Sequence, residues 1–293
     1  MSSDQLSAEI EPSFSNLKPL KMFEYPNQAS NMIWDVNPDN FLQITSQIVK
    51  LIKTNKITVE LAFYLVDVFS SIRFKDIKLL ADLYQSISIE FSHITIKPRN
   101  ERLTTLLYYK GMRFEKFEPE MKEEDILNIF PTNSISHYVA WDKIDELKNK
   151  FPTINPQYVN QKMFPLDCAI KFGSELCFNY LRNIGAKYTK DSEKFAVQGG
   201  NEYIFNQMIE DGKTFDGLIN MALKYHNYQI ADYLKTEFGQ KPNSVAQSML
   251  YGNYGVASYL LSKGSYSNEY YGILFIFTFI ITSYNSFSLY KIS

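Results

Sequence analysis

The chain has 293 residues, of which 45% are hydrophobic, so it is long enough for one extended helical array or two modest domains with a core. Its formal net charge is −2, and acidic and basic residues are interspersed, so it lacks the basic region that binds nucleic acid or anionic lipid. We therefore expect a folded chain with no nucleic-acid partner.

Residues 1–38 are rich in Ser, Pro and Asn, with scattered aromatic residues, and predict a mobile leader that can dock onto the body of the protein. The first residues have neither a basic segment nor an apolar core, so no secretory signal is expected. The expected location is the cytoplasm.

Residues 39–131 predict an α-helical N-terminal domain. Asp39 is a candidate N-cap for an amphipathic helix over 41–56, and Thr58 opens a second helix that is apolar nearly all round. Further helices are predicted over 75–89 and 102–109. Short joints between consecutive helices favour an all-α domain.

Acidic residues cluster near the end of this domain, at Glu120, Glu123, Glu124 and Asp125. They lack the alternating spacing and the glycine of a calcium loop. Acidic side chains also favour the positive N-terminal end of a helix. The cluster therefore predicts a solvated helix start near a domain boundary, and no metal site.

Residues 132–264 predict a solenoid, because one pattern recurs four times, in 164–185, 191–212, 217–239 and 242–264. Each repeat reads as two short helices. A small residue recurs in the first helix at spacings of 27, 26 and 26, and each repeat closes with a glycine. The small residues are Ala169, Ala196, Ala222 and Ser248. Residues 134–150 resemble a divergent first repeat, with Asp142 in the turn.

The turn between the two helices has its own pattern. A residue that tolerates a positive φ precedes a residue whose side chain can cap the next helix. The pairs are Gly173 with Ser174, Gly200 with Asn201, His226 with Asn227, and Gly252 with Asn253.

The segment FPLDCAIKFG, followed by NYLRNIGAKY, resembles a degenerate ankyrin repeat, in which Pro165, Leu166 and Ala169 match the family's TPLHxA pattern. The overall layout is similar to that of an uncharacterised ankyrin-clan domain found in large protozoan families. The resemblance implies an all-α fold, with a helical N-terminal domain followed by an ankyrin-like helix-turn-helix solenoid. The periods are shorter than the family's usual length of about 33 residues, which implies shortened loops.

The resemblance also implies a concave surface formed by residues two and three positions after the small one. Phe172, Tyr225 and Tyr251 would line one groove there, because aromatic rings supply large contact areas. The alternative is that these rings only pack under the short loops. The candidate partner-binding residues are Lys171, Phe172, Gln198, Lys224, Tyr225, Leu250 and Tyr251.

No catalytic, cofactor-binding or metal-binding residue is predicted. The three histidines are far apart in sequence, and Cys168 and Cys177 lack CxxC spacing and read as buried free thiols. No phosphate loop, nucleophile elbow or HExxH motif occurs.

The tail 265–293 has two interpretations. Residues 270–290 are uncharged and meet the length of a membrane span. Alternatively, Ile281 takes the small-residue position of a truncated fifth repeat, 33 residues after Ser248.

We therefore expect a non-catalytic scaffold that binds a protein partner through its concave surface. The first alternative is a tail-anchored membrane adaptor that uses the same repeats and is located at a membrane. A remote alternative is an enzyme with a site between the two helical halves.

Overall fold

The structure is a computed structural model that describes residues 12–155 and 163–264. These residues form α-helices and short 3-10 helices, with no β-strand among them, which confirms the all-α class. The first half of the chain contributes α1 (Glu24–Trp34), α2 (Phe41–Lys53), α3 (Val59–Ser70), α4 (Ile77–Glu90), α5 (Glu101–Tyr109) and α6 (Glu123–Leu127), together with the 3-10 helices η1 (Phe14–Asn16), η2 (Lys21–Phe23) and η3 (Phe74–Asp76).

Helices α2 to α5 pack on one another much as their apolar spacing predicts. Thr58 caps α3, since its hydroxyl accepts a hydrogen bond from the backbone N–H of Leu61 at 3.2 Å. Helix α3 is buried on most of its surface and lies against both α1 and α4. The predicted N-cap at Asp39 is wrong: the cap position belongs to Asn40, whose side chain bonds to the N–H of Asn37.

Residues 12–34, within the predicted leader, form η1, η2 and α1 and pack against the body. Phe14, Phe23, Ala29 and Ile33 are buried. Their neighbours include α14 and α16, near the other end of the chain. Because these contacts come from distant segments, no local period in the sequence marks residues 12–23 as structured.

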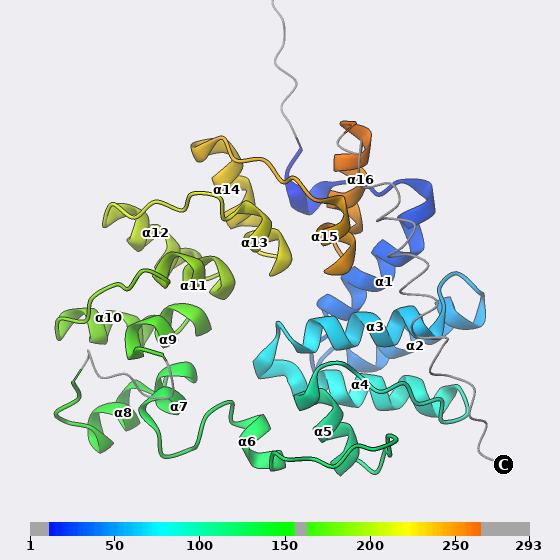
Figure 1. Cartoon of the computed structure of the whole chain (residues 1–293), viewed down its shortest axis with the longest axis horizontal. Coiled ribbons are helices and arrows are strands. Elements are labelled where there is room, and N and C mark those ends of the chain that lie inside the picture. The colour runs from blue at the N-terminus through cyan, green and yellow to red at the C-terminus, as the bar shows by residue number, and fades with distance from the viewer. Residues whose placement is uncertain (1–11, 156–162, 265–293) are drawn as a thin grey trace, which may run out of the picture.

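The helices from α7 to α16, within the described residues, form five pairs. Figure 1 shows how these pairs follow one another. The first helices of successive pairs contact each other in chain order, α7 with α9, α9 with α11, α11 with α13, and α13 with α15. Their bounds are α7 (Ile135–Ala140), α8 (Ile144–Lys150), α9 (Pro165–Phe172), α10 (Glu175–Asn183), α11 (Ser192–Gly199), α12 (Glu202–Glu210), α13 (Ile219–Lys224), α14 (Tyr228–Phe238), α15 (Val245–Leu250) and α16 (Tyr254–Ser262).

The small residues of the repeats lie where these first helices meet. All four are buried, with exposed fractions of 0% to 7%. The approach is close: a Cβ atom added to Gly199 would lie 2.4 Å from the carbonyl oxygen of Ile170 on the preceding pair. A side chain at Gly199 would therefore force α9 and α11 apart.

The turn residues hold positive φ values as predicted, 65° at Gly173, 69° at Gly200, 56° at His226 and 75° at Gly252. The predicted capping role of the following residue holds only for Asn201, whose side chain accepts from the N–H of Ile204.

The other three following residues reach back to the preceding pair instead. Ser174 donates to the carbonyl of Ala140 at 3.3 Å, Asn227 to Val197 at 2.7 Å and Asn253 to Leu223 at 2.8 Å. The predicted capping role is therefore wrong for these three side chains, because each donates its hydrogen bond to a carbonyl group near the end of the preceding first helix. Their role is to join neighbouring helix pairs.

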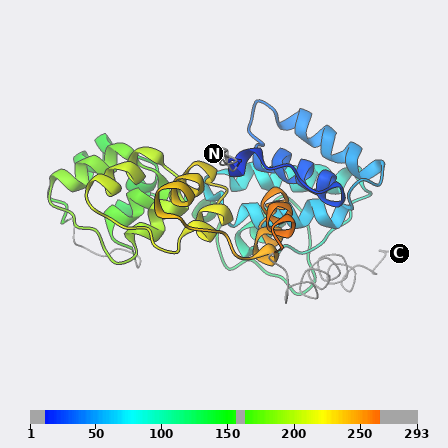
Figure 2. The same ribbon diagram turned by 90° about the horizontal axis from the view of Figure 1, so that it is seen from above.

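The last helix pair returns to the first helices of the chain, and α16 lies beside α1 (Figures 1 and 2). The Ser30 hydroxyl donates to the carbonyl oxygen of Gly252 at 2.7 Å, and the Tyr64 hydroxyl donates to that of Leu250 at 2.7 Å. The two halves of the chain therefore contact each other, with α1 and α3 on one side and the end of α15 with the turn that follows it on the other.

Cys168 and Cys177 are free and buried, as predicted. Burial raises the pKa of Cys168 to about 12 and also raises that of Cys177. Within residues 12–155 and 163–264, no helix has the length and apolar character needed to span a membrane. Both interpretations of the tail 265–293 fall outside the described residues.

Candidate functional site

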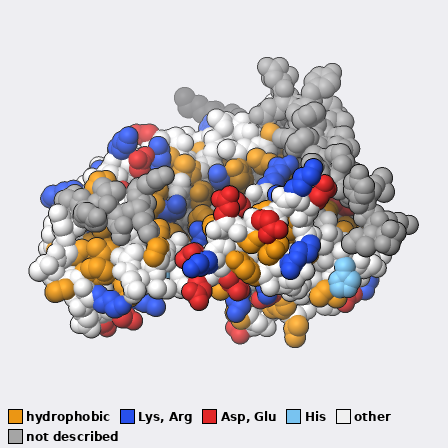
Figure 3. Space-filling view, turned by 60° about the horizontal axis from the view of Figure 1, so that its bottom comes forward, with side chains coloured by type: hydrophobic (Ala, Val, Ile, Leu, Met, Phe, Trp, Pro, Cys, Tyr) orange, Lys and Arg blue, Asp and Glu red, His pale blue; other side chains and the backbone are white. Residues whose placement is uncertain are grey.

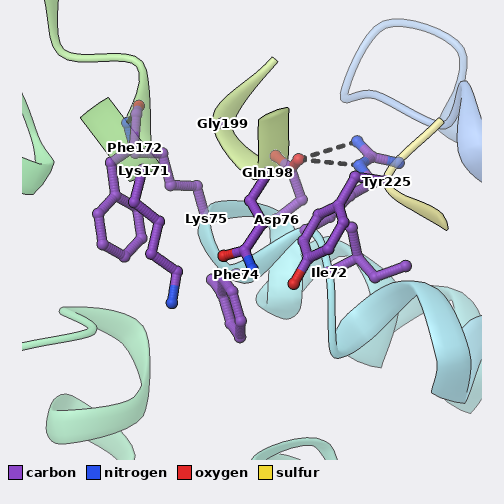
Figure 4. Close-up of a pocket in the computed structure, with 10 residues that line it drawn as sticks. Ile72, Phe74, Lys75, Asp76, Lys171, Phe172, Gln198, Gly199 and Tyr225 are labelled. Carbon is purple, nitrogen blue, oxygen red and sulfur yellow. Dashed lines mark hydrogen bonds and ion pairs between the residues drawn. The ribbon is translucent and has the colours of Figure 1, made fainter. Parts of the chain in front are cut away.

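A cleft lies between the connection that follows α3 and the ends of three first helices (Figure 4). Its volume is about 180 Å³. A cavity of about 150 Å³ holds a benzene molecule, so the cleft has room for one side chain of a ligand. It is lined by Ile72, Arg73, Phe74, Lys75, Asp76, Lys171, Phe172, Gln198, Gly199 and Tyr225.

The repeat pattern explains how one wall of the cleft forms. Lys171 and Phe172 end α9, Gln198 and Gly199 end α11, and Tyr225 directly follows α13. Because α9 contacts α11 and α11 contacts α13, the C-terminal ends of these three helices meet at this wall. The opposite wall is η3 and the two residues before it.

Aromatic and cationic contacts connect the two walls. The Phe74 ring lies 6.4 Å from the Phe172 ring, centroid to centroid, and the Lys171 ammonium lies 5.5 Å from the Phe74 ring. The Lys75 ammonium donates to the carbonyl oxygen of Phe172 at 3.2 Å. The Phe172 ring also packs edge-on against Phe130 at 5.7 Å.

Positive charge is in excess in the cleft. Asp76 forms an ion pair with Arg73 at 2.9 Å, and the Arg73 guanidinium also donates to the carbonyl oxygens of Trp34 and Val36. Among the described residues, Lys75 and Lys171 form no ion pair. Burial lowers the pKa of both lysines. By contrast, acidic and basic side chains are mixed on the face shown in Figure 3.

Three polar groups that line the cleft form no strong hydrogen bond with other described residues. The Lys171 ammonium contacts the rings of Phe74, Phe172 and Phe195. The Gln198 amide contacts only the sulfur of Met221, at 3.7 Å. The Tyr225 hydroxyl forms no hydrogen bond within the described residues, and burial raises its pKa. Figure 4 shows the Gln198 amide and the Tyr225 ring near Phe74.

The structure brings together four of the seven predicted partner-binding residues, Lys171, Phe172, Gln198 and Tyr225. Lys224 and Tyr251 line a separate, much smaller depression of about 10 Å³. Leu250 lies outside both depressions, and its backbone carbonyl group accepts a hydrogen bond from the Tyr64 hydroxyl. All seven side chains are partly exposed. Of the predicted strip of three aromatic rings, Tyr251 lies outside the larger cleft, but the Lys224 ammonium lies over both the Tyr225 ring, at 5.7 Å, and the Tyr251 ring, at 4.6 Å.

The wall formed by residues 72–76 is not among the predicted partner-binding residues. Its only local signal is a pair of basic residues around an aromatic one, Arg73, Phe74 and Lys75, between two apolar helices. Nothing in that pattern indicates that the segment lies opposite α9, which begins about 90 residues later.

Buried titratable groups elsewhere make structural contacts. Asp67 accepts from the backbone N–H groups of Arg99 and Asn100, each at 2.9 Å, and Asp167 accepts from the hydroxyls of Ser192 and Thr189. Burial raises the pKa of both carboxyl groups. In the described part of the chain, no three His, Cys, Asp or Glu side chains gather in a way that could hold a metal ion.

No protein-family model, no curated protein and no solved structure matches this chain. Its function must therefore be inferred from the cleft and the chemistry of the residues that line it.

Proposed function

We propose that the chain is a non-catalytic interaction scaffold whose helix pairs form an ankyrin-like solenoid, with its helical N-terminal domain packed against the concave side. The contacts between successive first helices and the hydrogen bonds from Ser174, Asn227 and Asn253 to the preceding pair support this architecture. The boundaries that we assign are 39–131 for the first domain and 132–264 for the solenoid.

The observation that carries the proposal is that three consecutive helix pairs direct residues from the ends of their first helices into one cleft. Phe172, Gln198 and Tyr225 come from different pairs, yet they line the same space. Each is partly exposed. Aromatic side chains in such positions bury a large area on binding and lose little conformational freedom, which makes them effective contacts for a protein partner.

The proposed partner-binding surface combines residues of the N-terminal domain with residues of the helix pairs. Residues 72–76 cover one side of the concave face, and the contacts of Ser30 and Tyr64 cover its C-terminal end. A partner would therefore contact the cleft where the face stays open, at the ends of α9, α11 and α13. We infer that it inserts a short segment, because the cleft volume of about 180 Å³ suits a side chain.

The proposal is tested by affinity capture with the full chain, comparing wild type with the double variant Phe172→Ala, Tyr225→Ala. A matched control, Leu176→Ala with Tyr203→Ala, removes one apolar and one aromatic side chain from the exposed surface of the second helices, where their exposed fractions are 57% and 41%. We expect a protein that the control variant retains and the cleft variant loses, with melting temperatures near that of wild type. If every captured protein binds both variants equally, the cleft is not the binding surface.

A second double variant, Tyr225→Ala with Tyr251→Ala, tests whether both tyrosines contribute to partner binding. Because Tyr251 lies outside the larger cleft, we expect Tyr225→Ala alone to account for most of the lost binding. A large fall in melting temperature for the double variant would instead assign both rings to the packing of the fold.

A further inference from the structure

The lysines of the concave face lack anionic partners. Lys75, Lys171 and Lys224 form no ion pair within the described residues. Of the eight ion pairs in that part of the chain, the one between Arg73 and Asp76 lines the cleft and the other seven lie elsewhere. Lys171 and Lys224 instead lie over aromatic rings, Lys171 over Phe74 at 5.5 Å and Lys224 over Tyr251 at 4.6 Å. An ammonium group held this way is partly desolvated but keeps its charge available.

From this arrangement we propose that the cleft binds an acidic peptide segment of a partner protein, with a carboxylate side chain inserted beside Lys171. This inference rests on the proposed function and names the chemistry of the partner. The Lys171 ammonium, the Gln198 amide and the Tyr225 hydroxyl supply donors, and Phe74 and Phe172 contact the hydrocarbon part of the inserted side chain. The bound carboxylate offsets the excess positive charge of the cleft.

A carboxylate fits this cleft better than a phosphate group. Phosphate sites generally use free arginine forks, helix N-termini or glycine-rich loops. Here the guanidinium of Arg73 is already bonded to Asp76 and to the carbonyl of Val36. The ends of α9 and α11 at the cleft are C-terminal, and their partial negative charge disfavours a dianion.

The position of Lys171 explains why the bound side chain should carry a negative charge. Its side chain is partly buried, and burial lowers its pKa, so the folded protein holds a cation in a poorly solvated place. A charge-assisted hydrogen bond to a ligand carboxylate stabilises that cation. A neutral amide of the same shape stabilises it less, because its oxygen carries no net charge.

The test uses the full chain and an array of short peptides that differ only at one central position, which holds Glu, Gln or phosphoserine. Binding is then measured by fluorescence anisotropy with the fluorescein-labelled peptides that bind best. We expect Glu peptides to bind about tenfold more tightly than their Gln counterparts, since a hydrogen bond to a charged group contributes more than one to a neutral group. Higher salt should weaken the Glu peptides more.

Two variants assign the effect to the cleft. Lys171→Gln should weaken the Glu peptide about tenfold and leave the Gln peptide nearly unchanged, and Tyr225→Phe, which removes only a hydroxyl, should weaken it less. The control is Lys148→Gln on α8, an exposed lysine that also lies over a ring, that of Tyr180 at 5.0 Å. It should bind like wild type.

Equal binding of Glu and Gln peptides, stronger binding of phosphoserine peptides, or insensitivity to Lys171→Gln would each overturn the inference. These results are distinct from a failure of the proposed function. If a captured protein depends on Phe172 and Tyr225 but not on Lys171, the scaffold proposal stands and the acidic-peptide inference fails. If no captured protein depends on the cleft, the scaffold proposal itself fails.

Discussion

The indole ring of Trp34 stacks on the imidazole ring of His226, with 4.1 Å between ring centroids and 14° between ring planes. Trp34 ends the first α-helix of the chain, and His226 occupies the turn between α13 and α14. Phe69 of α3 packs edge-on against both rings. This aromatic cluster therefore joins the N-terminal helices to the third of the four repeats.

Removing Trp34 tests how much this contact stabilises the fold. Trp34→Ala deletes the stacked ring and leaves a space between α1 and the turn, so we expect a loss of about 3 kcal/mol in the free energy of unfolding. Chemical denaturation followed by circular dichroism measures it. Met22→Ala is the control, because Met22 is 65% exposed and should change stability by less than about 0.5 kcal/mol. Equal effects of the two variants would contradict the prediction.

His226 should make the stability of the protein depend on pH. Burial lowers the pKa of His226 to about 4 from the ordinary value of 6.5, while the backbone carbonyl of Tyr251 accepts its Nε2–H at 2.8 Å. The unfolded chain therefore binds a proton that the folded chain excludes, so the stabilisation is full above pH 6.5 and is lost as the pH falls towards 4. The expected loss is about 3 kcal/mol.

The variant His226→Asn isolates this effect, since Asn tolerates the φ of 56° at this position. Denaturation curves between pH 7 and pH 4 should show a shallower pH dependence for the variant than for wild type. His137 and the buried carboxyl groups titrate in both proteins, so the difference between the curves reports on His226. Parallel curves would show that His226 does not cause the dependence.

Gly252 tests the contact between the last helix pair and the first helices. A Cβ atom there would lie 2.5 Å from the Ser30 hydroxyl and 3.1 Å from the Phe69 ring, in a backbone with φ of 75°. Gly212 has a similar φ of 78° but open space around it. We expect Gly212→Ala to cost about 1 kcal/mol from backbone strain alone, and Gly252→Ala to cost about 1–3 kcal/mol more from the clash. Similar melting temperatures for the two variants would argue against close packing at Ser30.

Asn253 tests the hydrogen bonds that join neighbouring pairs. Its amide donates to the buried carbonyl of Leu223 at 2.8 Å and its oxygen accepts from the Tyr228 hydroxyl at 2.6 Å. Asn253→Ala leaves that carbonyl without its partner, so unfolding should become easier by about 2 kcal/mol. Asn149→Ala, at an exposed position on α8, is the matched control. A loss below 0.5 kcal/mol for Asn253→Ala would mean that the bond contributes little.

The sequence by itself determined those features of this protein that depend on nearby residues. The apolar spacing of the helices, the glycines with positive φ and the buried small residues could all be predicted, because each depends on neighbours within one turn or one repeat. The same pattern predicted one surface for Lys171, Phe172, Gln198 and Tyr225, and these four residues line one cleft.

Only the tertiary structure decided what lies opposite that face. The wall formed by Phe74 and Lys75, the stack of Trp34 on His226, and the return of α16 to α1 join segments separated by roughly 100 to more than 200 residues. Such contacts depend on how two surfaces fit together in space. They leave no period in the sequence, because each joins one part of the chain to a single distant part and is not repeated from turn to turn or from repeat to repeat.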